Sequence, residues 1–134
     1  MKRRVVVTGL GVVSSIGIGK DEFWNNLIAG KSGISDVELF DTSSYPVHRG
    51  GEVKNFDPSK YIPKNRIKVI ARTSQFAIAA AKLAFDDAGL DVLGHKNKKV
   101  ATILGTTMGE AGMIEEIDKH WTNQGEEDIW GLIH

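Results

Sequence analysis

Two glycine-containing stretches near the start of the chain have residue types that could hold a phosphate group. The first is a valine-rich segment, residues 4–14, which contains Gly9-Leu10-Gly11, and the second is Gly30-Lys31-Ser32. A strand that leads through such glycines into a helix can bind a phosphate with backbone amides. Both motifs are incomplete, because Ser14 stands where the dinucleotide pattern needs glycine and Asn25 where the phosphate loop needs glycine. The sequence therefore argues against a nucleotide site.

The chain has few groups that could act as a nucleophile or as metal ligands. It contains no cysteine, which excludes disulfides, thiolate metal sites and a cysteine nucleophile within these 134 residues. No serine stands in a Gly-x-Ser-x-Gly pattern, so a hydrolase of that type is not expected. We expect no metal and no cofactor. The histidines lack metal-type spacing with Asp or Glu and are expected to be surface or packing residues: His48, His95, His120 and His134.

The composition indicates a globular protein with no attraction to polyanions. Hydrophobic residues make up 41% of the chain, and 17 basic residues balance 17 acidic ones. A formal net charge of zero predicts no nucleic-acid partner and no anionic membrane surface as a partner. The basic start and apolar run are diluted by Thr8, Gly9 and Gly11, so a signal peptide is not expected. No segment reaches the ~20 apolar residues of a membrane span, and we expect a cytoplasmic protein.

Two apolar segments predict central strands of an α/β fold. Residues 4–14 form a continuous apolar run, which is typical of a strand covered on both faces in a parallel sheet. Gly9 and Gly11 would let the chain turn tightly after this run. A second buried strand is expected at residues 100–105, and the two strands have room for a crossover connection between them.

Three helices are expected to accompany these strands. Residues 21–30 predict a short helix on which Trp24 anchors the helix to the sheet. The strongest helical pattern covers residues 65–88 and stops at Gly89. Its small residues predict a close approach to another backbone at the centre of a larger body. A third helix follows, with apolar residues one turn apart at Met113, Ile117 and Trp121.

A long connection covers residues 31–63. It contains several turn residues, and Gly51-Glu52-Val53 predicts a short extended segment. A connection of this length is unusual in a compact domain. We therefore expect it either to pack on another element or to form a binding surface.

Several stretches resemble the elongating β-ketoacyl-acyl-carrier-protein synthases, and especially the synthase II type. These stretches cover the whole chain without a sizeable gap. The resemblance implies a thiolase-like layered α/β/α fold, usually a homodimer, of which residues 1–134 would be the amino-terminal portion. The similar segments are Lys2-Arg3-Arg4-Val5-Val6-Val7-Thr8-Gly9-Leu10-Gly11, Trp24 with residues 27–34, Phe40-Asp41-Thr42-Ser43-Ser44-Tyr45, and residues 105–109 with Gly112-Met113-Ile114-Glu115-Glu116.

The resemblance implies a decarboxylative condensation of an acyl thioester with malonyl carried on acyl carrier protein, in fatty acid or polyketide synthesis. In that family a cysteine nucleophile takes the acyl group, and two histidines with a lysine promote decarboxylation and bond formation. None of these catalytic residues can be identified here. We therefore expect the catalytic half to be absent, and the 134-residue chain to be inactive and poorly soluble alone.

Two sets of residues take binding roles from the resemblance. Met108 matches a position that lines the acyl-chain pocket near the dimer interface, where a flexible thioether suits an acyl channel. The basic patch for the acidic acyl carrier protein matches Lys64, Arg66 and Lys68, which would otherwise be read as a solvated helix end. The acidic run Glu126-Glu127-Asp128 departs from the family pattern and would repel that partner locally.

Two other functions stay open. A non-catalytic partner subunit of the chain-length-factor kind would shape a pocket or bind a carrier without making bonds. The residue at the nucleophile position in the continuing reading frame distinguishes the two, since cysteine favours the enzyme. A nucleotide-binding oxidoreductase is the third alternative, and a direct dinucleotide titration tests it.

Overall fold

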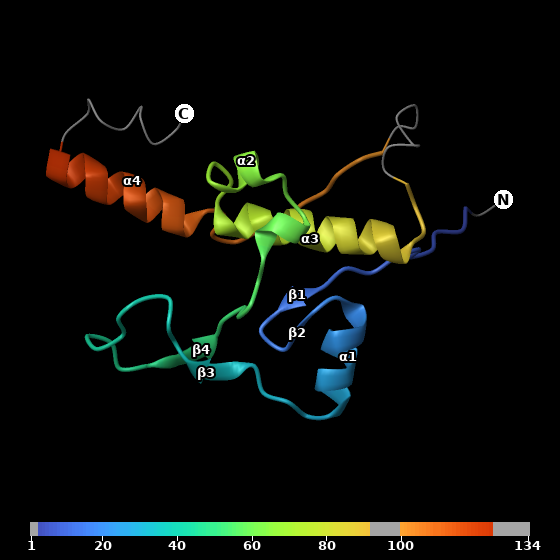
Figure 1. The fold of residues 1–134 in the computed structure, drawn as a ribbon, viewed down its shortest axis with the longest axis horizontal. Coiled ribbons are helices and arrows are strands. Elements are labelled where there is room, and N and C mark those ends of the chain that lie inside the picture. The colour runs from blue at the N-terminus through green and yellow to red at the C-terminus, as the bar shows by residue number, and fades with distance from the viewer. Residues whose placement is uncertain (1–2, 92–99, 125–134) are drawn as a thin grey trace.

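The fold is described from a computed structural model for residues 3–91 and 100–124. Figure 1 shows α3 and α4 along one side of the molecule and the two small sheets with α1 on the opposite side. In chain order the elements are β1 (Val13–Ser14), β2 (Gly17–Ile18), α1 (Lys20–Ile28), β3 (Ile34–Asp36), β4 (Arg49–Gly51), the 3-10 helix η1 (Pro58–Lys60), α2 (Lys64–Ile67), α3 (Arg72–Asp87) and α4 (Ala111–Gln124).

The described strands form two separate antiparallel hairpins. In the first, Val13 lies opposite Ile18, and Ser14 lies opposite Gly17. In the second, β3 pairs with β4 with Ile34 opposite Gly51. The long connection of residues 31–63 thus contains a sheet of its own. The short extended segment predicted at residues 51–53 is β4, shifted so that only Gly51 is shared.

The prediction of a buried central strand over residues 4–14 is wrong for most of this segment. Only its last two residues belong to a strand, and Val5 and Val7 are 94% and 81% exposed. The predicted strand at residues 100–105 is also absent, and Ile103 is 94% exposed. A strand forms only when a neighbour accepts and donates its backbone hydrogen bonds, and no described segment does so for either run.

Gly9 and Gly11 serve a close approach rather than the tight turn that the sequence suggests. A Cβ atom on Gly11 would lie 1.9 Å from the carbonyl oxygen of Ala80, and one on Gly9 would lie 2.1 Å from that of Ala84. The extended segment before β1 therefore runs against the small residues of α3. This confirms that these residues admit a second backbone. Ala79 is the one residue of α3 that the described chain buries, and the burial of this helix at the centre of a larger body stays a prediction.

The helix predicted over residues 65–88 is two helices. Ala71 has an extended backbone with φ −66° and ψ 159°, which separates α2 from α3. The Gln75 side chain occupies the break, because its Nε2 donates to the carbonyl oxygens of Ile67 at 3.1 Å and Ile70 at 2.7 Å. The predicted end is confirmed, since Gly89 adopts φ +63° just beyond the helix.

Helix α1 is attached mainly by polar contacts. The prediction that Trp24 anchors this helix to a sheet is wrong, because its side chain is 59% exposed. Instead Asn26 Nδ2 donates to the Ile16 carbonyl oxygen, and the Ile18 amide donates to Glu22 Oε2 at 2.9 Å. These bonds fasten α1 to the β1–β2 hairpin.

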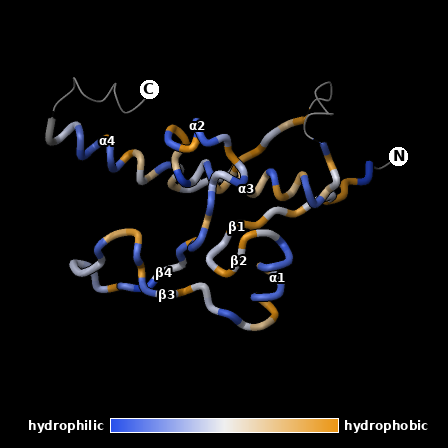
Figure 2. The backbone as a smooth tube through the Cα atoms, viewed as in Figure 1, coloured by the Kyte–Doolittle hydropathy of each residue, from blue (hydrophilic) through white to orange (hydrophobic). Residues whose placement is uncertain are grey.

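Apolar burial is small in the described part of the chain. Ile62 and Ala79 are its buried hydrophobic residues. Figure 2 shows hydrophobic stretches along the segment before β1 and along the segment that leads to α4. Among the described residues, no helix is long and apolar enough to cross a membrane.

Candidate functional site

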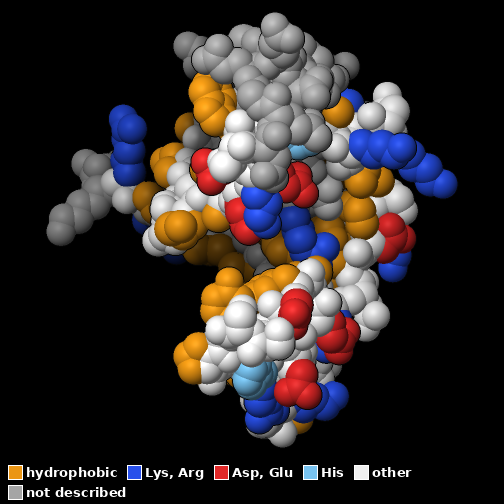
Figure 3. All heavy atoms as spheres, turned by 90° about the vertical axis from the view of Figure 1, so that its left-hand side faces the viewer, with side chains coloured by type: hydrophobic (Ala, Val, Ile, Leu, Met, Phe, Trp, Pro, Cys, Tyr) orange, Lys and Arg blue, Asp and Glu red, His pale blue; other side chains and the backbone are white. Residues whose placement is uncertain are grey.

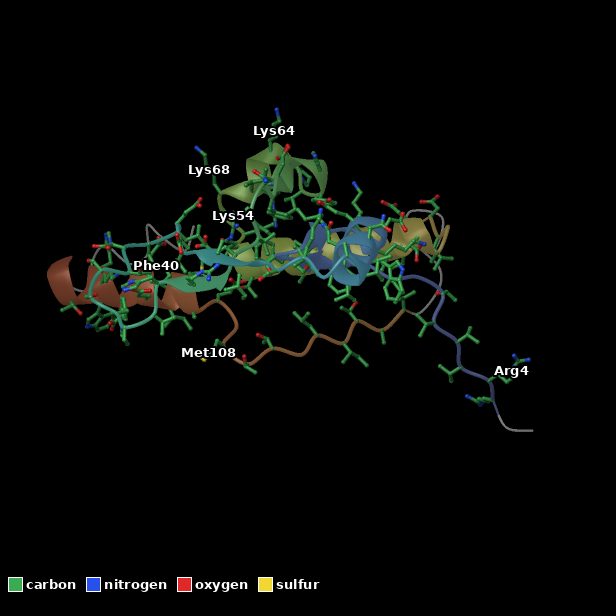
Figure 4. All side chains as sticks on the ribbon, turned by 90° about the horizontal axis from the view of Figure 1, so that it is seen from below. Arg4, Phe40, Lys54, Lys64, Lys68 and Met108 are labelled. Carbon is green, nitrogen blue, oxygen red and sulfur yellow. The ribbon has the colours of Figure 1, made fainter. Side chains whose placement is uncertain are left out.

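Three basic side chains lie on α2 and at its end, and we call them the α2 basic patch: Lys64, Arg66 and Lys68. All three are exposed, and none forms an ion pair within residues 3–91 and 100–124. Figure 4 shows the side chains of Lys64 and Lys68 projecting from the same side of the molecule. The structure therefore brings the predicted basic residues together on one solvent-facing helix.

An aromatic cluster joins the segments that precede and follow α2 in the chain. The Phe56 ring stacks on Tyr61 at 5.9 Å and meets the edge of Phe76 at 4.9 Å. The Arg72 guanidinium lies 4.9 Å from the Phe76 ring centre and donates to the Val53 carbonyl oxygen at 2.9 Å. These contacts bring together the two segments between which α2 lies in the chain.

One carboxylate near the patch is kept ionised by local hydrogen bonds. The hydroxyl and amide of Ser59 both donate to Asp57 Oδ1, at 2.7 and 2.9 Å. These bonds, with smaller contributions from Lys60 and Lys64, lower the pKa of Asp57 below its ordinary value. Asp57 thereby also caps η1.

Met108 lies in a turn between residues 100–105 and α4. The Gly109 amide donates to Thr106 Oγ1 at 3.0 Å, and Gly109 adopts φ +55°, which closes the turn around Met108. The Met108 side chain is 72% exposed. Figure 4 shows it on the opposite side of the ribbon from Lys64 and Lys68. We call residues 106–109 the Met108 turn.

Glu110 connects the Met108 turn to α3. Its Oε1 accepts a hydrogen bond from the Ser74 amide at 2.9 Å and another from the Ser74 hydroxyl. A shallow cavity of about 300 Å³ lies beside this contact and is lined by Lys68 and Arg72 on one side and by Met113 on the other. Sequence reasoning missed Glu110, because its partner lies 36 residues away and no local capping pattern joins them.

A larger hollow separates α4 from the loop between β3 and β4. It has a volume of about 810 Å³, and Phe40, Tyr45 and Val47 line it opposite Glu115 and Lys119 of α4. Figure 3 shows this hollowed face, with hydrophobic side chains along its margins. The long connection therefore lines a partly apolar hollow together with α4, and its role as a binding surface stays a prediction.

The remaining candidate groups that the structure describes do not assemble into a metal site. His48 is exposed, with Nδ1 3.2 Å from Thr42 Oγ1, and His120 is half-buried. His95, His134 and the acidic run at residues 126–128 lie outside the described residues. Within residues 3–91 and 100–124, no three His, Asp or Glu side chains gather closely enough to hold a metal ion.

The phosphate-type motifs also lack their required context. Gly30 adopts φ +66° just after α1, so Gly30-Lys31-Ser32 ends a helix where a phosphate loop would begin one. The glycines at positions 9 and 11 pack on α3 and do not open a helix.

Comparison with known proteins assigns the family. The family model for the beta-ketoacyl synthase N-terminal domain matches residues 2–134. This chain belongs to the beta-ketoacyl synthase family. Solved ketosynthase structures have the same fold, so the chain has the N-terminal part of the thiolase-like layered fold.

Two curated relatives illustrate the family's range. The chain is 38% identical over 115 residues to 3-oxoacyl-[acyl-carrier-protein] synthase 2 of Coxiella burnetii. It is 46% identical over 87 residues to the tetracenomycin polyketide synthase ketoacyl synthase beta subunit of Streptomyces glaucescens. The first match covers 86% of this chain and 28% of that protein, and the second covers 65% and 21%. The chain thus spans less than a third of the length of these relatives.

Two solved synthase structures superpose on the chain. The ishigamide ketosynthase/chain length factor matches with a TM-score of 0.87 at 36% identity, covering 96% of this chain and 32% of that one. A type II polyketide synthase acyl-carrier protein in complex with its ketosynthase, bound to the hexaketide, matches with a TM-score of 0.69 at 32% identity. That second match covers 100% of this chain and 31% of the other.

Proposed function

We propose that residues 1–134 are the amino-terminal portion of a β-ketoacyl-acyl-carrier-protein synthase of fatty acid or polyketide synthesis. The observation that carries this proposal is the match of residues 2–134 to the synthase N-terminal domain. The identity with 3-oxoacyl-[acyl-carrier-protein] synthase 2 over 86% of the chain supports it.

The proposed reaction is a decarboxylative condensation. A cysteine thiolate takes the acyl group from its carrier thioester and releases the carrier thiol. Malonyl thioester then loses carbon dioxide, and the resulting carbanion attacks the acyl-enzyme carbonyl, so that a carbon–carbon bond forms and the cysteine thiolate leaves. Since these 134 residues contain no cysteine, the nucleophile belongs to sequence outside them.

The α2 basic patch is the proposed docking site for acyl carrier protein. Its three cations face solvent without ion-pair partners in the described part of the chain, so their charge is available to an acidic protein. A related ketosynthase has been solved in complex with its acyl-carrier protein, which supports a carrier partner for this chain.

Met108 is the proposed wall residue of the acyl-chain pocket. Its exposed thioether is apolar and flexible, which suits contact with acyl chains of varying shape. A pocket wall that is 72% exposed needs a covering surface, and we propose that a second copy of the protein contributes it in a homodimer.

A reconstitution assay tests the proposed function. The complete gene product is incubated with acyl-carrier and malonyl-carrier thioesters, and we expect carbon dioxide release together with a β-ketoacyl product two carbons longer. Intact mass of the protein after exposure to the acyl thioester alone should increase by one acyl group. Failure to form either the product or the acyl-enzyme overturns the proposal.

A non-catalytic partner subunit is the second candidate. The 46% identity to a polyketide synthase ketoacyl synthase beta subunit favours it. Such a subunit would form no acyl-enzyme alone but would change the product length when mixed with a catalytic synthase subunit. A cysteine at the nucleophile position in the continuing reading frame would exclude this candidate.

A further inference from the structure

Glu110, the residue that follows the Met108 turn, makes a long-range polar contact with Ser74. Ser74 lies in the first turn of α3, where backbone amides lack helical acceptors. The Glu110 carboxylate accepts both the amide and the hydroxyl of Ser74, in a half-buried position. Hydrogen bonds to a carboxylate are stronger than those between neutral groups. This contact therefore restrains the segment that contains Glu110.

The Met108 turn has little freedom between its two attachments. The Gly109 amide closes the turn on Thr106 Oγ1, and Glu110 follows directly. On the other side, the Ile114 amide donates to the Glu110 carbonyl oxygen at 3.0 Å, which joins Glu110 to the start of α4. The Glu110 side chain thus connects the turn to α3, and the Glu110 backbone connects it to α4.

The same turn of α3 also holds α2. Gln75, the residue after Ser74, donates to the carbonyl oxygens of Ile67 and Ile70. The α2 basic patch and the Met108 turn are consequently attached to adjacent residues of one helix, although they face opposite sides of the molecule (Figure 4).

We propose that Glu110 is a positioning residue, which clamps the Met108 turn to the first turn of α3 and so sets where the Met108 side chain projects. Its effect on substrates rests on the proposed role of Met108 in the acyl-chain pocket. Loss of the clamp lets the turn move relative to α3. Acyl chains that depend on contact with Met108 then bind in a changed pocket, whereas binding of the malonyl thioester is unaffected.

Three variants separate the clamp from a general loss of charge. Glu110→Ala removes both hydrogen bonds. Glu110→Gln keeps an amide oxygen that can accept from the Ser74 amide, so it should retain most of the clamp. Glu116→Ala is the matched control, because Glu116 lies on α4 beside the same cavity but makes no hydrogen bond to α3 in the described part of the chain.

Methyl NMR of methionine-labelled complete gene product tests the clamp directly. Met108→Leu assigns the Met108 signal. We expect Glu110→Ala to shift and narrow the Met108 signal. Glu110→Gln and Glu116→Ala should resemble the wild type, and Glu116 lines the same cavity as Glu110. An unchanged Met108 signal in Glu110→Ala, or an equal change in Glu116→Ala, overturns the proposal.

An acyl-chain-length profile on the same variants separates this inference from the proposed function. For the acyl chains that contact Met108, kcat/KM should fall roughly tenfold in Glu110→Ala, since displacements of about 1 Å can cost up to ~100-fold. The KM for the malonyl thioester should stay constant. If Glu110→Ala shifts the Met108 signal but leaves the dependence of kcat/KM on acyl-chain length unchanged, the clamp is supported and the acyl-pocket role of Met108 is wrong. If the signal does not move, the clamp itself fails.

Discussion

At the scale of single residues, the glycines before β1 have a measurable structural role. The missing side chain of Gly11 lets the extended segment lie directly against the Ala80 carbonyl oxygen, with only 1.9 Å left for a Cβ atom. Backbone atoms cannot yield at such a distance without moving the helix. The segment and α3 are thus fitted to each other at this position.

Gly11→Ala is expected to destabilise the protein by about 1–3 kcal/mol, the usual cost of an overpacked contact. The free energy of unfolding, measured by urea denaturation of the complete gene product, tests this. Gly105→Ala is the matched control, because nothing lies within 4 Å of its would-be Cβ atom. Equal stability of the two variants would contradict the close contact.

The Asp87 carboxylate makes stability depend on pH. Lys20 donates to Asp87, and the Leu10 amide donates to its Oδ2 at 2.9 Å. The Lys20 hydrogen bond first, and the Leu10 bond second, lower the pKa of Asp87 below its ordinary value of 3.8. Because the folded-state pKa is depressed, this stabilisation is complete above the unfolded-state value and is lost as the pH falls through the folded-state value.

The Asp87→Asn variant should therefore have a lower melting temperature than the wild type at neutral pH. This difference in melting temperature should disappear as the pH falls below the ordinary pKa range of carboxyl groups. Thermal melting of both proteins between neutral and acidic pH measures it. Asp86→Asn, on the neighbouring exposed residue, should show no such convergence. A difference that persists unchanged at low pH would contradict the role of the Asp87 charge.

At the scale of elements, Gln75 joins α2 to α3. Its side chain bonds two carbonyl oxygens in the break between these helices. Without the Gln75 hydrogen bonds, the carbonyl oxygens at the end of the four-residue helix α2 would lose their side-chain donor, and an isolated helix of this length is unstable. The orientation of the α2 basic patch therefore depends on a side chain of the next helix.

Gln75→Ala should cost about 1–2 kcal/mol in local stability, because two carbonyl groups lose their donor. Hydrogen exchange of the amides of residues 64–70 should become faster by the corresponding factor, roughly 5- to 30-fold. Thr73→Ala, on an exposed residue of the same helix turn, is the control. Unchanged exchange in residues 64–70 would show that α2 is held by other contacts.

The α2 basic patch should behave as a steering surface for an acidic carrier. Combined Lys64→Glu, Arg66→Glu and Lys68→Glu substitutions should slow carrier association by at least about tenfold at low salt, and added salt should reduce the difference. Surface binding kinetics of the complete gene product with acyl carrier protein measure this. Lys31→Glu, at an exposed cation outside the patch, should have little effect. Equal rates for all these variants would remove the patch from the interface.

At the scale of the whole molecule, the described chain is open and exposes apolar segments. Val5, Val7 and Ile103 are each more than 80% exposed. Contiguous exposed apolar surface of this kind favours association with other surfaces. These segments have the composition of covered strands but are exposed in the described chain.

The 134-residue chain, expressed alone, should self-associate and bind a hydrophobic dye such as ANS. Replacing Val5 and Ile103 together by lysine should reduce both effects without altering the helix content, because neither residue lies in a helix. Light scattering after size exclusion and dye fluorescence measure this. A monodisperse monomer with cooperative melting and no dye binding would contradict the expectation.

The sequence by itself determined where α3 ends, that α4 is a helix, and the family. The end of α3 follows from Gly89, and α4 follows from its apolar residues one turn apart, because helical hydrogen bonds join residues close in sequence. The family was identified from its motifs, and the match over residues 2–134 confirms it. Lys64, Arg66 and Lys68 were predicted at the start of one long helix, whereas the structure has them on the separate short helix α2 and at its end.

Only the tertiary structure decided the contacts between distant segments. Residues 4–14 have the composition of a strand, but strand formation depends on a neighbour, and the described chain supplies none for most of this run. The packing of Gly11 on Ala80 and the bond of Glu110 to Ser74 likewise join residues far apart in sequence. A local sequence pattern carries no information about such partners, because it reflects only interactions between residues that are close in the chain.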